Sequence, residues 1–199
     1  MTVLDFLSPG LADAGALARS PMDRAQRDAG ATFAERDGWL VPISLPGEAE
    51  RLAAAGVADL SHVTKLEVRP AGEAPATGGI WYPISRRRAL LLGTAAQAAA
   101  ARGWLTGRLV VDVTAQHGVI VLVGPEAPAV LRRLTHLHHF PAGGELAHIT
   151  VHVLERGGGY WIVFPQEYGH YLWEVVVDRA EPFGGGPVGV DALPAEVLA

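Results

Sequence analysis

The 199-residue sequence contains no cysteine and only one lysine, Lys65. Without cysteine the chain cannot form disulfides, thiol nucleophiles, iron–sulfur clusters or cysteine zinc sites. Charged residues make up 19% of the chain, against roughly 25% in typical soluble proteins. A subunit that is buried in an assembly has such a sparsely charged surface, so the composition favours a protein with protein partners.

The sequence also lacks a positive net charge and a long apolar run. Its net charge of −5 argues against nucleic-acid binding, which needs clustered Lys and Arg to release phosphate counterions. No run of about 18 uncharged apolar residues is present, so no membrane span is expected. The opening MTVLDFLSPGLADAG has no basic leader of the kind that signal peptides carry. We therefore expect a cytoplasmic protein with neither nucleic-acid nor membrane partners.

The stretch Gly56–Arg69 organises the rest of the chain. Within it Leu66 and Val68 alternate with charged residues, which predicts a half-buried strand. The phrase Val-x-Asp-aliphatic-hydroxyl occurs at residues 57–61 and again at residues 110–114, each time ahead of a strand. This repetition indicates either a weak internal duplication of one supersecondary unit or two chance strand entries.

The remaining pattern repeats strand, strand and helix about three times. Hairpins join most strands, which predicts an α+β fold of two similar halves, with antiparallel or mixed sheets and helices on one face. We expect a lead segment over 1–20 and one domain over 21–199, with halves at about 21–107 and 108–199. No helix is expected in Met22–Glu35, whose apolar residues are sparse, and Gly56 is expected to be a left-handed helix cap. Strands are predicted at 80–82, 88–92, 108–113, 119–123, 149–153 and 160–164, and helices at 47–55, 95–102, 166–180 and after Pro125.

Histidines offer the one candidate for metal binding. His136, His138 and His139 follow a predicted helical face and could supply two ligands, but no acidic partner follows at a diagnostic spacing. His148 and His152 would lie about 13 Å apart along one strand, too far to share a metal ion. The simpler interpretation is that the trio lies at a helix C-terminus, where the helix dipole favours histidine. A histidine-based metalloenzyme is therefore the least favoured of the hypotheses.

Four motifs together carry a family resemblance: Ser20-Pro21-Met22, residues 30–43 (GATFAERDGWLVPI), residues 168–174 (YGHYLWE) and residues 185–193 (GGPVGVDAL). In their order and spacing the chain resembles the glycine-cleavage T-protein family, the folate-binding aminomethyltransferases. Its length and ending look more like the gamma subunit of heterotetrameric sarcosine oxidase. The resemblance implies the α+β first domain of T-proteins. It also implies an assembly in which larger subunits hold FAD, FMN, NAD and the folate site.

The chain departs from the family at one hairpin. The resemblance implies a hairpin whose turn reads roughly Gly-Gly-aliphatic-x-Asp-Asp. In T-proteins that transfer the aminomethyl group, an aspartate of this turn serves the folate chemistry. We match this turn to the hairpin of residues 155–163 (ERGGGYWIV), which keeps the glycines and has no aspartate. Because a carboxylate is needed to steer an amine at the folate, the sequence predicts no catalytic residues and no aminomethyl transfer by this chain alone.

Two functions follow from this interpretation. The first is a non-catalytic small subunit of a sarcosine oxidase-like (N-methyl amino-acid) oxidoreductase, with Trp39, His62, Lys65, Tyr168 and Tyr171 facing a larger subunit. The alternative is a stand-alone folate or one-carbon binding protein. Tetrahydrofolate would then be the candidate ligand, with arginines on its glutamate tail and with Arg86, Arg88 and Trp161 as the candidate binding residues.

Overall fold

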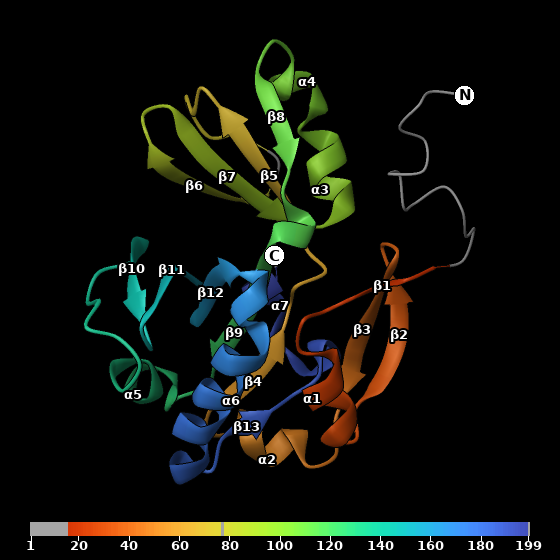
Figure 1. Cartoon of the computed structure of the whole chain (residues 1–199), viewed down its shortest axis with the longest axis vertical. Helices are drawn as coiled ribbons and strands as arrows, with labels where there is room; N and C mark the ends of the chain where they lie inside the picture. Colours follow the sequence, from red (N-terminus) through yellow and green to blue (C-terminus); the bar gives the residue numbers. More distant parts are fainter. Residues whose placement is uncertain (1–15, 77, 199) are drawn as a thin grey trace.

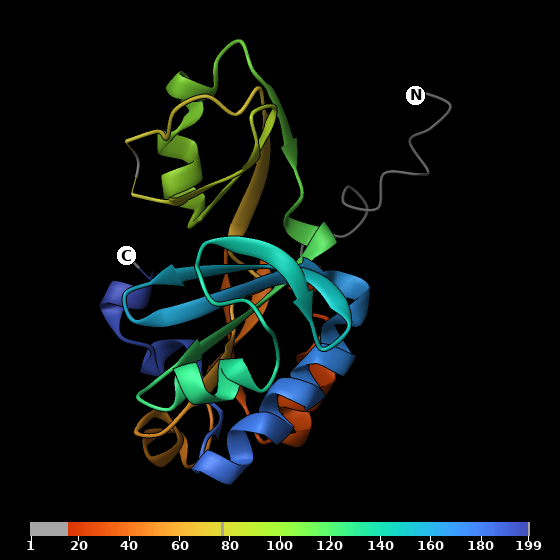
Figure 2. The ribbon, with the colours of Figure 1, turned by 90° about the vertical axis from the view of Figure 1, so that its left-hand side faces the viewer.

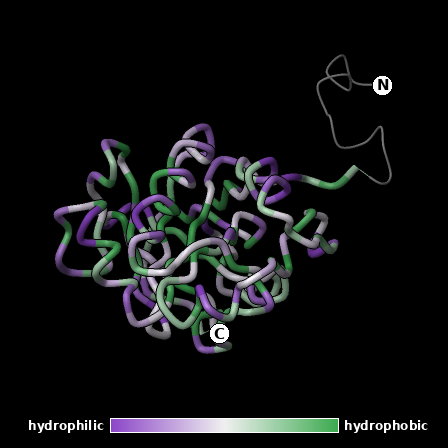
Figure 3. Tube along the Cα trace, turned by 90° about the horizontal axis from the view of Figure 1, so that it is seen from below, coloured by the Kyte–Doolittle hydropathy of each residue, from purple (hydrophilic) through white to green (hydrophobic). Residues whose placement is uncertain are grey.

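Two lobes, each built around a β-sheet, make up the computed structural model, which describes residues 16–76 and 78–198 (Figure 1). Of the lead segment predicted over 1–20, residues 1–15 lie outside the described residues. The mixture of sheets and short helices confirms the predicted α+β class. Hydrophobic segments run through the middle of the molecule and polar ones over its surface (Figure 3).

The small lobe is a four-stranded antiparallel sheet in the order β6-β7-β5-β8. Trp81, Leu91 and Val68 on one face pack against two short helices. A Thr94 capping box starts the first helix. The elements are β5 (Thr64–Arg69), β6 (Ile80–Ser85), β7 (Arg88–Gly93), α3 (Ala95–Ala100), α4 (Arg102–Leu105) and β8 (Leu109–Asp112).

The large lobe holds a six-stranded sheet in the order β10-β11-β12-β9-β4-β13, antiparallel except for the β13–β4 pair. One face is covered by α6 and, at its ends, by α5 and α1 (Figure 2), with Trp173, Leu131 and Met22 in the shared core. The strands are β4 (Gly56–Asp59), β9 (His117–Val123), β10 (Ala142–Leu146), β11 (Ile149–Arg156), β12 (Gly159–Pro165) and β13 (Gly186–Pro187); the helices are α1 (Asp23–Asp28), α5 (Ala127–Arg132) and α6 (Gly169–Ala180).

The other face of this sheet contacts the small lobe. Trp161 and Val163 of the large sheet share a core cluster with Tyr82 and Leu90 of the small one. The same cluster reaches a three-stranded sheet in the order β1-β3-β2 through Val41. The remaining elements are β1 (Ala18–Arg19), β2 (Thr32–Arg36), β3 (Trp39–Ser44), α2 (Glu48–Leu52), α7 (Ala195–Leu198) and the 3-10 turns η2 (Thr114–Gln116), η3 (Gln166–Tyr168), η4 (Glu181–Phe183) and η5 (Val190–Ala192).

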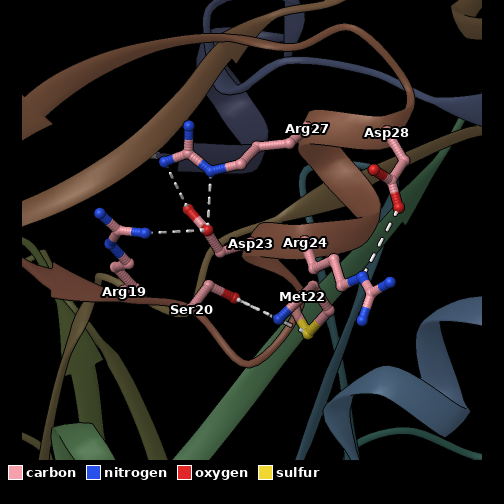
Figure 4. A network of polar contacts seen from close by, with 7 residues as sticks. All are labelled: Arg19, Ser20, Met22, Asp23, Arg24, Arg27 and Asp28. Atoms are coloured by element: carbon pink, nitrogen blue, oxygen red, sulfur yellow. Dashed lines mark hydrogen bonds and ion pairs between the residues drawn. The ribbon is translucent and has the colours of Figure 1, made fainter.

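The prediction that residues 22–35 contain no helix was wrong, because α1 lies there. The strand β2 begins in the same stretch. The Ser20 hydroxyl accepts a hydrogen bond from the Met22 N–H at 3.1 Å, and the Asp23 carboxylate binds Arg27 at 2.9 Å (Figure 4). Asp23 in the first turn and Arg27 in the last also suit the helix dipole. Local polar contacts and tertiary burial of Met22 thus stabilise a helix that apolar periodicity does not reveal.

The prediction for Gly56 was also wrong. The helix before it ends at Leu52, and Gly56 opens β4 without a left-handed backbone. Glycine is required there for close packing, because a Cβ would lie 3.0 Å from Leu52 Cδ1 and 3.1 Å from Val188 Cγ2. The left-handed residue is Gly47 at the start of α2, with φ of 70°.

The histidine trio does not lie at a helix end. Helix α5 stops at Arg132, and Thr135 then forms an isolated bridge with Leu146. His136, His138 and His139 therefore follow in irregular chain, where the helix dipole does not reach them. The Thr135 hydroxyl donates to the Glu145 carbonyl at 2.6 Å, and this bond draws the chain away from a further helical turn.

The turn between β10 and β11 is strained. Its two residues, Ala147 and His148, both have positive φ, 46° and 67°. Two-residue hairpins of this kind favour Asn-Gly, because a Cβ costs about 1 kcal/mol or more in the left-handed region. We expect the double substitution Ala147→Asn/His148→Gly to raise the free energy of unfolding by about 1–2 kcal/mol in urea denaturation. A decrease would mean that the His148 contact with Glu145 outweighs the strain.

Candidate functional site

The chain passes between the two lobes at two adjacent places. β4 leads through Asp59–Thr64 into β5, and β8 leads through Asp112–His117 into β9. Since β4 pairs with β9 in the large sheet and β5 with β8 in the small one, the two passages lie side by side. We call them the crossing.

The repeated phrase builds the crossing, and both copies adopt the same local structure. The Asp59 carboxylate accepts from the Ser61 N–H at 2.9 Å, and the Asp112 carboxylate accepts from the Thr114 N–H at 2.8 Å. Each hydroxyl then accepts a hydrogen bond from the other copy: Ser61 from the Val119 N–H at 3.1 Å, and Thr114 from the Lys65 N–H at 2.9 Å. This reciprocal bonding favours the duplication over two chance strand entries.

Removing the two hydroxyls tests the crossing. We expect Ser61→Ala to lower the free energy of unfolding by about 1–3 kcal/mol, because it leaves the buried Val119 N–H without its acceptor. Thr114→Val should cost less, since its bond is only partly buried. Urea denaturation of both single variants and the double variant gives their coupling. We expect the two losses of unfolding free energy to be coupled, because each hydroxyl joins one passage to the other. Losses that simply add in the double variant would contradict this expectation.

Lys65 lies inside the crossing. Its side chain is fully buried, and its ammonium donates to the Ser61 and Val63 carbonyls at 2.8 and 2.9 Å. Burial lowers the pKa of Lys65 to about 7, although Asp59 and Asp112 act in the opposite direction. The prediction that Lys65 faces a partner is therefore wrong, because the alternation that placed it outward does not reveal that a second lobe covers that face.

A shallow cleft of about 370 Å³ lies against the crossing. Trp39 and His62, two of the predicted partner-facing residues, line it together with Asp37, Thr64 and Asp112. Burial lowers the pKa of His62 to about 4, and the charges of Lys65 and Arg36 add to this effect. His62 is thus neutral near pH 7, and it can offer a hydrogen bond but no charge to whatever covers the cleft.

The small and large lobes also meet along a contact region that we call the seam. Glu67 and two arginines form its charged part. The Glu67 carboxylate binds Arg88 at 2.7 Å and Arg69 through a second, close contact. Burial raises the pKa of Glu67, but the hydrogen bonds and charges of Arg69 and Arg88 outweigh it and hold the pKa below its usual value. Two guanidinium groups on one carboxylate leave a net positive charge, which suits an anionic ligand.

Tyr82 and two histidines form the neutral part of the seam. The Tyr82 hydroxyl lies 3.2 Å from His152 Nδ1, and Gly143 is so close that a Cβ would approach this nitrogen to 3.0 Å. Burial lowers the pKa values of His117 and His152, whereas it raises that of Tyr82. Burial thus favours the neutral form of all three side chains. Sequence reasoning missed this group because its members come from β6, β9 and β11.

The three predicted folate residues do not form one site. Arg86 is exposed in the turn between β6 and β7, while Arg88 is held by Glu67. Trp161 is only 2% exposed and belongs to the core between the lobes, so its ring is not available to a ligand in this conformation. An open hollow of about 620 Å³ is lined by Arg69, Pro70, Ser85, Arg87 and Arg88.

The other predicted partner residues lie on the large lobe. Tyr168 and Tyr171, at the beginning of α6, are 40% and 42% exposed. Tyr171 borders a cleft of about 590 Å³ that also contains His136 and Arg179. Within the described residues, no three His, Asp or Glu side chains are grouped closely enough to hold a metal ion.

Neither hairpin of the large sheet carries an aspartate in its turn. The β11–β12 turn, to which we matched the family pattern, contains Gly157 and Gly158, and a Cβ on Gly157 would lie 2.1 Å from the Glu196 carbonyl oxygen. The β10–β11 hairpin fits the pattern at least as well, because Gly143-Gly144 precede a two-residue turn, and that turn is Ala147-His148. Gly157 packs the β11–β12 turn on α7, so this glycine serves packing.

No family model matches the sequence. Curated relatives are aminomethyltransferases: the proteins of Mycobacterium bovis and Mycobacterium leprae are each 25% identical over 92% of this chain. The chain spans 62% of their length.

Solved structures with a similar fold include the following two. One is the glycine cleavage system aminomethyltransferase T of Bartonella henselae (TM-score 0.68, 21% identity, 88% of this chain and 60% of that one). The other is the heterotetrameric sarcosine oxidase of Corynebacterium sp. U-96 (TM-score 0.59, 19% identity, 86% of this chain and 99% of that one). The chain thus has the T-protein fold. In sequence it is similar to aminomethyltransferases, as the motifs indicated. In the described part of the chain, no helix is long and apolar enough to cross a membrane.

Proposed function

We propose that this chain is a non-catalytic small subunit of a sarcosine oxidase-like oxidoreductase that acts on N-methyl amino acids. It packs on a larger subunit, and FAD, FMN, NAD and the folate site belong to the partner subunits. The observation that carries the proposal is that both Gly-Gly hairpins lack a turn aspartate, while Gly157 is packed against α7. The similarity to a chain of a heterotetrameric sarcosine oxidase over 99% of that chain's length supports it.

Exposed aromatic side chains provide a contact surface for such a subunit. Tyr168 and Tyr171 lie near one another at the start of α6, and tyrosine is among the residues enriched at interfaces. Trp39 and His62 offer a second, smaller patch in the cleft at the crossing. Aromatic side chains in both patches fit burial against another protein.

Co-expression tests the proposal. The chain is produced alone and together with the large subunits of a sarcosine oxidase-like flavoprotein, and native mass is measured for each preparation. We expect a stable complex, and no aminomethyl transfer to tetrahydrofolate by the chain alone. Tyr171→Ser should weaken the complex, whereas Glu174→Gln on the same helix should not. An isolated chain that transfers one-carbon units at an appreciable rate would overturn the proposal.

A stand-alone folate-binding protein is the second candidate. It is favoured by the net positive group of Glu67, Arg69 and Arg88, beside a hollow that Arg87 also lines. Titration with tetrahydrofolate, followed by tryptophan fluorescence, tests it. A saturable response that Arg87→Gln weakens would support folate binding, and no response at high micromolar ligand would remove this candidate.

A further inference from the structure

The outer edge of the small sheet is unusually apolar. β8 is the edge strand of the order β6-β7-β5-β8, and it runs along one border of the small lobe (Figure 2). Leu109 and Val111 of this strand are 58% and 40% exposed, and with Tyr168 and Tyr171 they are the exposed large hydrophobic residues of the described chain. Proteins normally protect an edge strand with charges, proline or a bulge, because an open edge can pair with another strand.

The hydrogen-bond pattern shows which backbone groups face outward. The Val113 N–H donates to the Lys65 carbonyl at 2.9 Å, and the antiparallel register places Val111 opposite Glu67. Alternate residues of an antiparallel strand turn their N–H and C=O to the same neighbour. Val111 and Leu109 therefore bond to β5, whereas Val110 directs its N–H and C=O away from the sheet.

The sequence Arg108-Leu109-Val110-Val111-Asp112 is complementary to itself in an antiparallel pairing centred on Val110. Arg108 of one copy then faces Asp112 of the other, and Leu109 faces Val111. The outward N–H and C=O of the two Val110 residues meet at the centre as a hydrogen-bonded pair, which is the pattern that the register requires. Opposite charges and apolar pairs across strands each stabilise a sheet.

The charged ends of this segment are held in place. The Arg108 guanidinium donates to the Pro70 and Ala71 carbonyls at 2.8 and 2.9 Å and stacks on Trp104 at 4.1 Å. The Asp112 carboxylate is exposed, and one of its oxygens accepts from the Thr114 N–H. Arg108 and Asp112 therefore place opposite charges at the two ends of the segment, and the Val110 hydrogen bonds and apolar pairs between them carry the association.

From this self-complementarity we infer that two copies of the chain associate through β8 and join their small sheets into one continuous sheet across a twofold axis. Such an interface is isologous, since each residue meets its complement in the other copy. The segment is short, so the association is reversible, over roughly 10 µM to 1 mM. This inference does not depend on the proposed function, because it concerns the chain by itself.

Sedimentation equilibrium of the full chain tests it directly. The average mass should rise with concentration from 21.0 kDa, the mass of one chain, towards twice that value. Val110→Pro removes the outward N–H at the centre and should abolish the rise, with the far-UV circular dichroism spectrum as a check on folding. A chain that stays monomeric over the whole range overturns the inference.

Cross-linking tests the register. The natural chain has no cysteine, so a single introduced cysteine can form a disulfide only with a second copy. In an antiparallel hydrogen-bonded pair the Cα atoms lie about 5.5 Å apart, within the range of disulfides. Val110→Cys should therefore oxidise to a dimer at least tenfold faster than Ala96→Cys on the exposed surface of α3. Equal rates, or a mass rise that persists in Val110→Pro, would overturn the inference.

Discussion

Replacing Gly157 by alanine is expected to destabilise the fold by about 2–3 kcal/mol more than replacing its neighbour Gly158. Both glycines have positive φ, 54° and 76°, so alanine is strained at both positions to a similar degree. The difference is contact. A Cβ at Gly157 would lie 2.1 Å from the Glu196 carbonyl oxygen, whereas nothing lies within 4 Å of a Cβ at Gly158. The colliding atom is backbone and cannot rotate away.

Urea denaturation of the two variants measures this difference, with Gly158→Ala as the matched control. Gly158→Ala alone should cost about 1 kcal/mol. The result bears on function as well as on stability, because it tests whether the β11–β12 turn is a packing element that seats α7. Equal losses in the two variants would show that the turn can move off α7, and its glycines would then need another explanation.

The stability of the wild-type chain should rise with pH relative to Lys65→Met between pH 7 and roughly pH 10. Burial lowers the pKa of Lys65 in the folded state from 10.5 to about 7. Over this range the unfolded chain binds a proton that the folded chain has lost, so raising the pH favours folding. The difference in the free energy of unfolding between the wild type and Lys65→Met should change by about 3 kcal/mol in favour of the wild type.

Urea denaturation at several pH values measures this gap. The raised pKa values of Tyr82 and Tyr160 affect both proteins equally and cancel in the comparison. Methionine preserves most of the side-chain volume, so cavity formation does not dominate the difference. If the gap stays constant with pH, Lys65 keeps an ordinary pKa and is hydrated within the crossing.

The crossing shows how far local sequence can predict a site. The repeated Val-x-Asp-aliphatic-hydroxyl phrase pointed to two equivalent units, and the structure gives both the same carboxylate-to-backbone turn. The phrase could not show that each hydroxyl would bond to the other copy, since the partners Val119 and Lys65 are assigned only when β4 pairs with β9 and β5 with β8. Alternation in β5 likewise pointed Lys65 to solvent, and only the second lobe covers that face.

The candidate binding residues were less predictable than the fold. Arg86, Arg88 and Trp161 were grouped by chemical type, yet one is exposed in a turn, one is held by Glu67 and one is buried. The seam instead brings together Tyr82, His117 and His152, whose separation along the chain carries no local signal.

By itself the sequence determined the α+β class, the main strands, the long helix α6 and the resemblance to T-proteins, because alternation, helical periodicity, glycine placement and motif order are local properties of a chain. The tertiary structure alone decided which face of each strand is covered, whether Lys65 is buried and which histidines meet. Those outcomes depend on contacts between residues far apart in sequence, and such contacts exist only once the two lobes pack against each other.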